Sequence, residues 1–259
     1  MQVSFYSAKA GTIAQQTKMD VTANNIANVS TAGYKAKTLC FSDLLYHNMS
    51  GINGYDSNVK AGSGTKADRT SVSFEKGTAN LSSSNLDFSI EGRGFFVLQN
   101  PDTDEKYYTT NGNFVLAEKG DTFYLASKDG NFVLNAEGNP IQIVNPNKTA
   151  TEEDVELGKD GSPLYGEAVE LEDAKPGVVD FFRTDGMLSV GEANFVPVEK
   201  NGEPFLIDAE VTQGAFEGSN VDLAKEFTKV IEAQRAYQMS LRMVQTADEI
   251  QTLINNLRQ

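Results

Sequence analysis

Residues 220–257 read NVDLAKEFTKVIEAQRAYQMSLRMVQTADEIQTLINNL, and they contain the clearest periodic pattern of the chain. Large side chains recur there at alternating steps of four and three, with a glutamine in one slot: Leu223, Phe227, Val230, Gln234, Tyr237, Leu241 and Val244. This spacing predicts one face of a long α-helix that supercoils against a partner helix. Because Ser219 and Asp222 together resemble a capping box, we expect the helix to begin near residue 220.

The N-terminal stretch predicts a weaker helix that can serve as this partner. Its apolar and small residues fall roughly on one helical face: Phe5, Ala8, Ile13, Gln16, Met19, Ala23 and Ile26. The helix is expected to stop within NVSTAGYK (residues 28–35), where Gly33 can adopt the positive φ that ends a helix. Since so thin a stripe does not stabilise an isolated helix in water, we expect the two terminal helices to form a coiled coil.

The residue composition of the middle of the chain changes at about residue 41 and again at about residue 86. Residues 41–85 are rich in Gly, Ser and Asn, which predicts an extended linker with one edge strand in VSFEKG (72–77). From residue 86 the pattern favours strands, and NGNFVL (111–116) is echoed by DGNFVL (129–134), each beginning with a turn dipeptide. Two turn-and-strand units at this interval predict a β-meander.

These patterns together predict an α+β fold. A β-rich middle domain, built as a meander, a sandwich or a barrel-like sheet, is inserted between N- and C-terminal helices that form a coiled coil. The expected parts are a helix with its connecting loop, a linker, a β-rich domain and a second helix, with these boundaries: 1–40, 41–85, 86–215 and 216–259.

Composition excludes several classes of function. The 259 residues carry a net charge of −14, which argues against nucleic acid as a partner. Cys40 is the only cysteine and His47 the only histidine, so a disulfide framework, a CxxC site and a multi-histidine metal site are excluded. The apolar runs are far too short to insert in a membrane. The first residues lack the basic segment of a signal peptide, so we expect a cytosolic protein or one exported without a cleavable signal.

No motif predicts a cofactor, a metal or a catalytic centre. Residues 92–94, GRG, lack the third glycine of a dinucleotide fingerprint, and 62–66, GSGTK, lack the spacing of a phosphate-binding loop. Residues 102–104, DTD, begin like a calcium loop that Lys106 interrupts. With 36 acidic residues, a catalytic carboxylate pair remains an open alternative.

Three stretches together resemble one known family. They are DVTANNIANVSTAGYK (20–35), LDFSIEGRGFFV (86–97) with YTTNGNF (108–114), and EGSNVDL (217–223) continuing to IEAQRAY (231–237) and QTADE (245–249). In this order they resemble the bacterial flagellar hook and basal-body rod family, and within it most closely the proximal and distal rod proteins. The resemblance touches both ends of the chain and its middle.

The resemblance implies a structural, non-enzymatic subunit of the flagellar basal-body rod, which crosses the cell envelope. Such subunits leave the cell through the flagellar type III export apparatus and polymerise helically through their terminal helices with further copies and with other rod and hook subunits. The resemblance places assembly contacts at the end of the first helix and in its loop, and along the second helix. These residues are Asn24, Asn25, Ile26, Asn28, Gly33, Tyr34, Gly218, Ser219, Asn220, Gln234, Arg235 and Tyr237, beside the other stripe residues Leu223, Phe227, Val230, Leu241 and Val244.

Two other classes of function stay open. One is a secreted surface-binding module that its helical ends oligomerise, and the other is a carboxylate-based hydrolase of cell-wall glycans. From the residues alone, the asparagines of 24–28 also suit a helix end with Asx turns.

Overall fold

The computed structural model describes residues 2–50, 56–119, 122–143 and 175–257. The chain forms two compact units, and each is assembled from segments that are distant in the sequence. The first, here called the helical unit, comprises Met1–Ala27, Lys37–Ser73 and Asp222–Gln259. The second, here called the β unit, comprises Asn28–Ala36 and Phe74–Val221. The helices therefore flank a β-rich middle region, as the sequence predicts.

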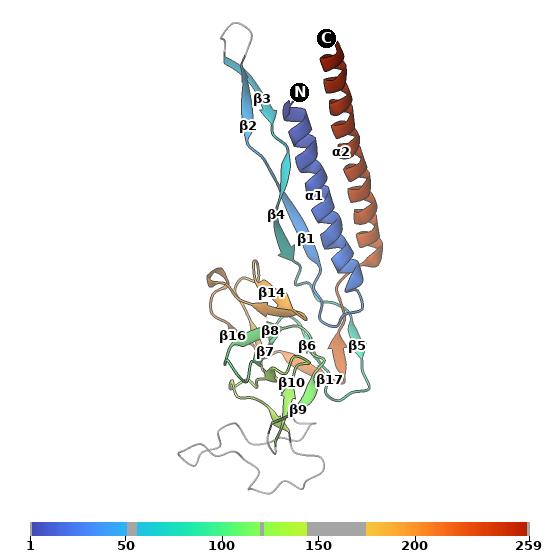
Figure 1. The fold of residues 1–259 in the computed structure, drawn as a ribbon. Helices are drawn as coiled ribbons and strands as arrows, with labels where there is room; N and C mark the ends of the chain where they lie inside the picture. The colour runs from blue at the N-terminus through green and yellow to red at the C-terminus, as the bar shows by residue number, and fades with distance from the viewer. Residues whose placement is uncertain (1, 51–55, 120–121, 144–174, 258–259) are drawn as a thin grey trace. The chain divides into compact units, whose positions relative to one another are not determined.

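Two long helices dominate the helical unit. α1 (Gln2–Ala27) and α2 (Leu223–Leu257) pack side by side and run in opposite directions (Figure 1). Neither helix contains a Pro, so each can continue without a break. The length of α2 is further supported by the good helix formers that fill it. The helices pack together as expected, whereas their supercoiling stays a prediction.

The packed face of α2 coincides with the predicted stripe only in part. Ala233 is fully buried, and a Cβ on Gly11 of α1 would lie 3.5 Å from the Ser240 hydroxyl, so small residues let the helices approach closely. Phe227 and Leu241 instead remain 54% and 37% exposed. Leu223, Gln234 and Arg235 are also exposed, while Val230, Tyr237 and Val244 are half-buried. Phe227 and Leu241 thus lie on the outside of the helix pair, whereas Val230, Tyr237 and Val244 border the packed face.

The same correction applies to α1. Phe5 and Ile13 are exposed, although they belong to the face expected to pack. The buried positions are Ala14, Thr22 and Asn25, which are small or polar. Hydrophobic periodicity could not indicate this face, because few of its members are apolar.

The segment expected to be a linker is largely strand. β1 (Lys37–Asp43) pairs antiparallel with β4 (Thr65–Val72), and β2 (Tyr46–Ser50) pairs antiparallel with β3 (Asp56–Gly62). Both β1 and β4 contact α1. The predicted edge strand at 72–77 is wrong, because only Val72 lies in a strand. β4 is mostly polar, and the apolar residues of β1 (Leu39, Cys40 and Phe41) are consecutive, so neither strand shows the alternation that reveals a half-buried strand.

The β unit is a set of antiparallel pairings. Its main sheet has the order β12-β10-β11-β7-β8-β15-β14, with β13 joining β7 to β16 and β9 pairing with β10. The pairs β6–β17 and β5–β18 form two further two-stranded sheets. The bounds are β5 (Ala79–Leu81), β6 (Phe88–Glu91), β7 (Phe95–Gln99), β8 (Lys106–Thr109), β9 (Val115–Lys119), β10 (Thr122–Ala126), β11 (Phe132–Val133), β12 (Gln142–Ile143), β13 (Val178–Asp180), β14 (Leu188–Gly191), β15 (Asn194–Val196), a 3₁₀ turn (Glu199–Asn201), β16 (Phe205–Leu206), β17 (Glu210–Gln213) and β18 (Ala215–Glu217).

The core of the β unit is centred on β7. All four residues of its FFVL run are buried, as expected of a strand covered on both faces. Phe96 and Leu98 belong to a cluster that includes Phe88, Phe114 and Leu125. Aromatic rings add edge-to-face contacts, such as that between Phe96 and Phe114 with centroids 5.3 Å apart.

The two copies of the turn-and-strand echo form different structures. Asp129–Gly130 lies in a hairpin between β10 and β11, with Gly130 at φ +84°, as predicted. Asn111–Gly112 does not form one, because β8 pairs with β7 and β15 rather than with β9. Gly112 is instead required for packing, since any Cβ there would collide with the Phe88 carbonyl oxygen.

Candidate functional site

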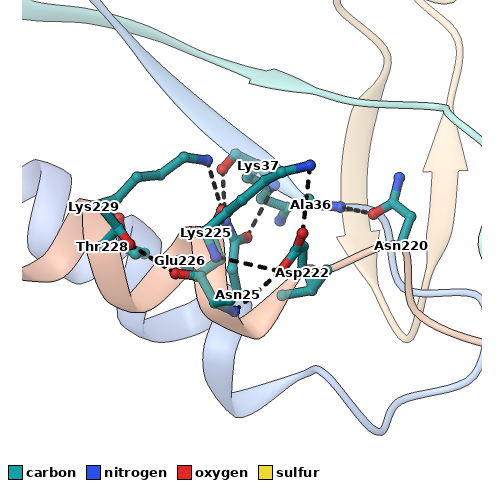
Figure 2. A network of polar contacts seen from close by, with 12 residues as sticks. Asn25, Ala36, Lys37, Asn220, Asp222, Lys225, Glu226, Thr228 and Lys229 are labelled. Carbon is teal, nitrogen blue, oxygen red and sulfur yellow. Dashed lines mark hydrogen bonds and ion pairs between the residues drawn. The ribbon is translucent and has the colours of Figure 1, made fainter.

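A buried polar network joins the three segments of the helical unit where α1 ends and α2 begins (Figure 2). Asn25 is 1% exposed, and both polar atoms of its side-chain amide form hydrogen bonds with the backbone of Lys37. Its Nδ2 donates to the Lys37 carbonyl at 2.8 Å, and the Lys37 N–H donates to its Oδ1 at 2.9 Å. The same Nδ2 donates to Glu226 Oε2 at 3.1 Å. One side chain thereby connects α1, β1 and α2.

Glu226 is the charged member of this network. It is buried in the first turn of α2, and Lys229 Nζ donates to its Oε1 at 2.6 Å. A buried carboxylate is costly unless it is paired, and here each carboxylate oxygen has a donor. The network is therefore internally satisfied.

Asp222 caps the start of α2. Its Oδ1 accepts the N–H groups of Ala224 and Lys225 at 3.0 and 3.2 Å, and the Lys225 ammonium lies 3.4 Å from Oδ2. The hydrogen bond from the Lys225 N–H, followed by the contacts of the Lys225 side chain and the Ala224 N–H, lowers the pKa of the Asp222 carboxyl. The helix start is thus near the predicted position, but Ser219 is not the cap. Its hydroxyl accepts the Val221 N–H at 3.3 Å.

A second polar cluster lies in the β unit, where the loop after α1 meets the segment before α2. Lys35 and Glu217 form a buried ion pair of 2.8 Å. Lys35 Nζ also donates to the Glu75 carbonyl at 3.0 Å, and Glu217 Oε1 accepts the Gly77 N–H at 2.6 Å. Both charges are therefore compensated by a partner and by backbone groups.

Gly33 allows this loop to approach the sheet. Its φ is +66°, as expected, but α1 already ends at Ala27, so Gly33 is not its C-cap. The Gly33 N–H donates to the Glu217 carbonyl at 2.7 Å, and the Thr110 hydroxyl donates to the Gly33 carbonyl at 2.7 Å. A Cβ here would lie 2.5 Å from the Asn111 nitrogen, so only glycine fits without a backbone shift.

Asn220 completes the cluster. Its Oδ1 accepts the Ala36 N–H at 2.7 Å, which Figure 2 shows, and its Nδ2 donates to the Glu75 carbonyl at 2.9 Å. Its own N–H donates to the carbonyl of the buried Tyr34 at 3.3 Å. Gly218 lies beside it, with its N–H donating to the Thr78 carbonyl at 2.8 Å.

The structure thus brings some of the predicted residues together and leaves others apart. Gly33, Tyr34, Gly218 and Asn220 meet in the β unit, and Asn25 lies in the network of the helical unit. Asn24 is exposed, Ile26 is half-buried, and Asn28 Oδ1 accepts the Thr31 hydroxyl at 3.2 Å. An assembly role for these residues and for the α2 stripe stays a prediction.

Sequence reasoning missed three charged residues of these networks, namely Lys35, Glu217 and Glu226. Lys35 lies two residues after Gly33, and Glu217 directly precedes Gly218. Only the folded chain shows that Lys35 and Glu217 form an ion pair. Among the described residues, no group of three or more His, Cys, Asp or Glu side chains could hold a metal ion. No helix in the described part of the chain is long and apolar enough to cross a membrane.

Comparison with known proteins gives matches along most of the chain. Residues 5–35 match the family model described as "Flagella basal body rod protein", residues 89–163 match "Flagellar hook protein FlgE/F/G D1 domain", and residues 212–257 match "Flagellar basal body rod FlgEFG protein C-terminal". The chain is 31% identical to the flagellar basal-body rod protein FlgG of Bacillus subtilis, with 97% of this chain and 98% of that protein covered.

Two further relatives are also flagellar basal-body rod proteins that match nearly the full length of the chain. FlgG of Buchnera aphidicola from Schizaphis graminum is 29% identical, with 98% of this chain and 99% of that protein covered. The flagellar basal-body rod protein FlgF of Mesorhizobium japonicum is 30% identical, with 99% and 98% covered.

Proposed function

This chain belongs to the flagellar basal-body rod family, and we propose that it polymerises helically through the large apolar side chains that α1 and α2 leave exposed. It is a structural subunit of the rod, located in the flagellar basal body and serving motility. Its relatives are structural rod proteins, and we propose that this chain likewise has no enzymatic activity.

The observation that carries the proposal is the outward displacement of the large side chains of α2. The helix packs small residues such as Ala233 against α1, yet many of its largest apolar side chains are exposed: Leu223, Phe227, Ile231, Met239, Leu241, Met243, Ile250, Leu253, Ile254 and Leu257. α1 adds Phe5, Tyr6 and Ile13. Exposed apolar surface of this kind is typical of protein interfaces, and each such side chain contributes about 1.5–3 kcal/mol when it becomes fully buried.

Further copies of this chain and other rod and hook subunits are the proposed partners. The family models that match the chain describe both rod and hook proteins, which supports assembly within one continuous axial structure. We also propose coiled-coil packing of the terminal helices in the assembled rod, and export of the subunit by the flagellar type III apparatus.

Single charge substitutions on α2 test the proposed contact surface. Phe227→Asp and Leu241→Asp each place a carboxylate where a neighbouring subunit is expected to bury an apolar group, and an unpaired buried charge costs several kcal/mol. Basal bodies purified from strains carrying either variant should lack this subunit, and the cells should be non-motile. Thr103→Asp is the control, because it adds the same charge to an exposed polar position outside α2.

The outcome is decided by comparing the three variants. Far-UV circular dichroism of each purified protein first verifies that the helices and the β unit keep their content. Normal swimming and normal incorporation of Phe227→Asp and Leu241→Asp would contradict assembly through this face. An equal defect in Thr103→Asp would show that added charge on the subunit, rather than loss of apolar contact on α2, is responsible.

A further inference from the structure

A cavity of about 310 Å³ lies in the β unit between two turns that are distant in the sequence. One is the turn after β10, which contributes Asp129 and Asn131, and the other is the turn between β14 and β15, which contributes Glu192. Tyr107 of β8 also lines the cavity. The polar side chains named here all present oxygen atoms, and the cavity contains neither a cysteine nor a histidine.

Two carboxyl groups meet in this cavity. The side chains of Asp129 and Glu192 are within hydrogen-bond reach of each other, and Asn194 Nδ2 donates to Asp129 Oδ2 at 3.0 Å. Asn194 is buried, so it fixes the orientation of the Asp129 carboxyl. Two ionised carboxylates repel each other at such a distance unless a cation or a proton lies between them. Lys128 is close enough to attract Glu192, but it does not line the cavity.

A buried amide provides an independent sign of a ligand. Asn131 lines the same cavity and is only 8% exposed. Its backbone carbonyl accepts the Ser127 N–H, but none of the hydrogen bonds present among the described residues involves its side chain. Its amide oxygen is therefore available to a ligand that the two carboxylates also bind.

We propose that this cavity binds a divalent cation, Ca²⁺, through the carboxylates of Asp129 and Glu192 and the amide oxygen of Asn131. Ca²⁺ takes oxygen ligands in irregular geometry and completes its shell with water, which suits two carboxylates and one amide at a partly open site. Mg²⁺ demands near-ideal octahedral geometry, and softer metals prefer the nitrogen and sulfur ligands that are missing here. With only two charged ligands, the site should have a Kd of about 10⁻⁴–10⁻³ M.

Cation binding would cross-link the sheet. Asp129 follows β10 and Glu192 lies between β14 and β15, and β10 pairs with neither of these two strands. The cation would therefore connect two turns that hydrogen bonds of the sheet leave separate. Because it binds only the folded arrangement, it should stabilise the β unit.

Thermal unfolding of the full chain tests the site. Addition of about 10 mM CaCl₂, against KCl of equal ionic strength, should raise Tm by about 3–11 °C. The double variant Asp129→Asn with Glu192→Gln should lose this rise. A second double variant, Asp102→Asn with Glu137→Gln, removes the same charge from exposed positions outside the cavity and should keep it.

Terbium luminescence locates the bound ion. Tb³⁺ replaces Ca²⁺ at oxygen sites and emits when a nearby aromatic side chain transfers energy to it, and this chain has no tryptophan. Emission excited through tyrosine should therefore depend on Tyr107. Tyr107→Phe should reduce the emission and preserve the rise of Tm with Ca²⁺. The absence of any Ca²⁺-dependent rise in the wild type would overturn the proposal, as would an equal rise in the Asp129→Asn, Glu192→Gln variant.

Discussion

Asn25 and Glu226, which are 201 positions apart in the sequence, share a hydrogen bond of 3.1 Å in the interior of the helical unit. The amide that makes this bond also pairs with both peptide groups of Lys37. The end of α1, the start of β1 and the first turn of α2 are thus held by a single side chain. A polar contact of this kind fixes the register of two helices whose packed faces are otherwise small and weakly apolar.

Asn25→Ala should destabilise the helical unit. The substitution leaves the Lys37 peptide groups and one Glu226 oxygen without their partner inside the protein, which costs about 1–3 kcal/mol. Urea denaturation followed by far-UV circular dichroism measures the loss. An exposed residue of the same helix is the control, and Gln16→Ala should change the free energy of unfolding by less than about 0.5 kcal/mol. Equal effects of the two variants would contradict the role given to the Asn25 network.

The Lys35–Glu217 ion pair should behave as a buried pair. Lys35→Met leaves the Glu217 carboxylate unpaired in the interior, which costs about 3–5 kcal/mol. Adding Glu217→Gln removes the charge and retains an acceptor for the Gly77 N–H, so the double variant should be more stable than Lys35→Met alone. Tyrosine fluorescence during denaturation reports on the β unit. Simple addition of the two single effects would show that the side chains are not coupled.

Gly33→Ala should be more damaging than an alanine at another glycine of positive φ. Gly138 has a φ of +86°, with no atom within 4 Å of a Cβ, so Gly138→Ala should cost only about 1–2 kcal/mol of backbone strain. Gly33→Ala adds a collision with the Asn111 backbone to a similar strain. Thermal unfolding of both variants makes the comparison. Equal Tm values for the two variants would show that the backbone around Gly33 can shift to admit a Cβ without loss of stability, which contradicts this prediction.

The start of α2 should depend on pH through Asp222. Folding lowers the pKa of this carboxyl below its ordinary value of 3.8, so its stabilising contribution is present above that pH and is lost as the pH falls through the folded-state pKa. Amide protection factors at Ala224 and Lys225 should therefore decrease in acid. Asp222→Asn keeps an acceptor for these N–H groups and should remove the pH dependence. An unchanged acid transition in this variant would assign it to another group.

The sequence predicts the elements of this fold better than their packed faces. The length of α2 follows from an uninterrupted run of helix formers, and the buried β7 follows from its FFVL sequence. The packed face of α2 was misplaced because periodicity follows large side chains, whereas contact with α1 selects Ala233 and Ser240. The pairing of β1 with β4 was missed because β4 is mostly polar and the apolar residues of β1 do not alternate with polar ones.

The polar clusters were only partly predictable, for a similar reason. The resemblance to known rod proteins identified Asn25, Gly33 and Asn220, but it could not identify their contacts. Lys35 and Glu217 are 182 positions apart, and each is an ordinary surface residue type until the chain brings them together. Burial, rather than sequence pattern, distinguishes these two charges from the many that remain in solvent.

Oxidative footprinting of methionines tests the central claim most directly. Met239 and Met243 of α2 are 68% and 59% exposed in the single chain, whereas Met187 of the β unit is buried and serves as the internal reference. If neighbouring subunits cover the exposed face of α2, Met239 and Met243 should oxidise rapidly in the purified subunit and slowly in isolated basal bodies, with Met187 slow in both. Equal oxidation of Met239 and Met243 in the subunit and in the basal body would contradict assembly through this face.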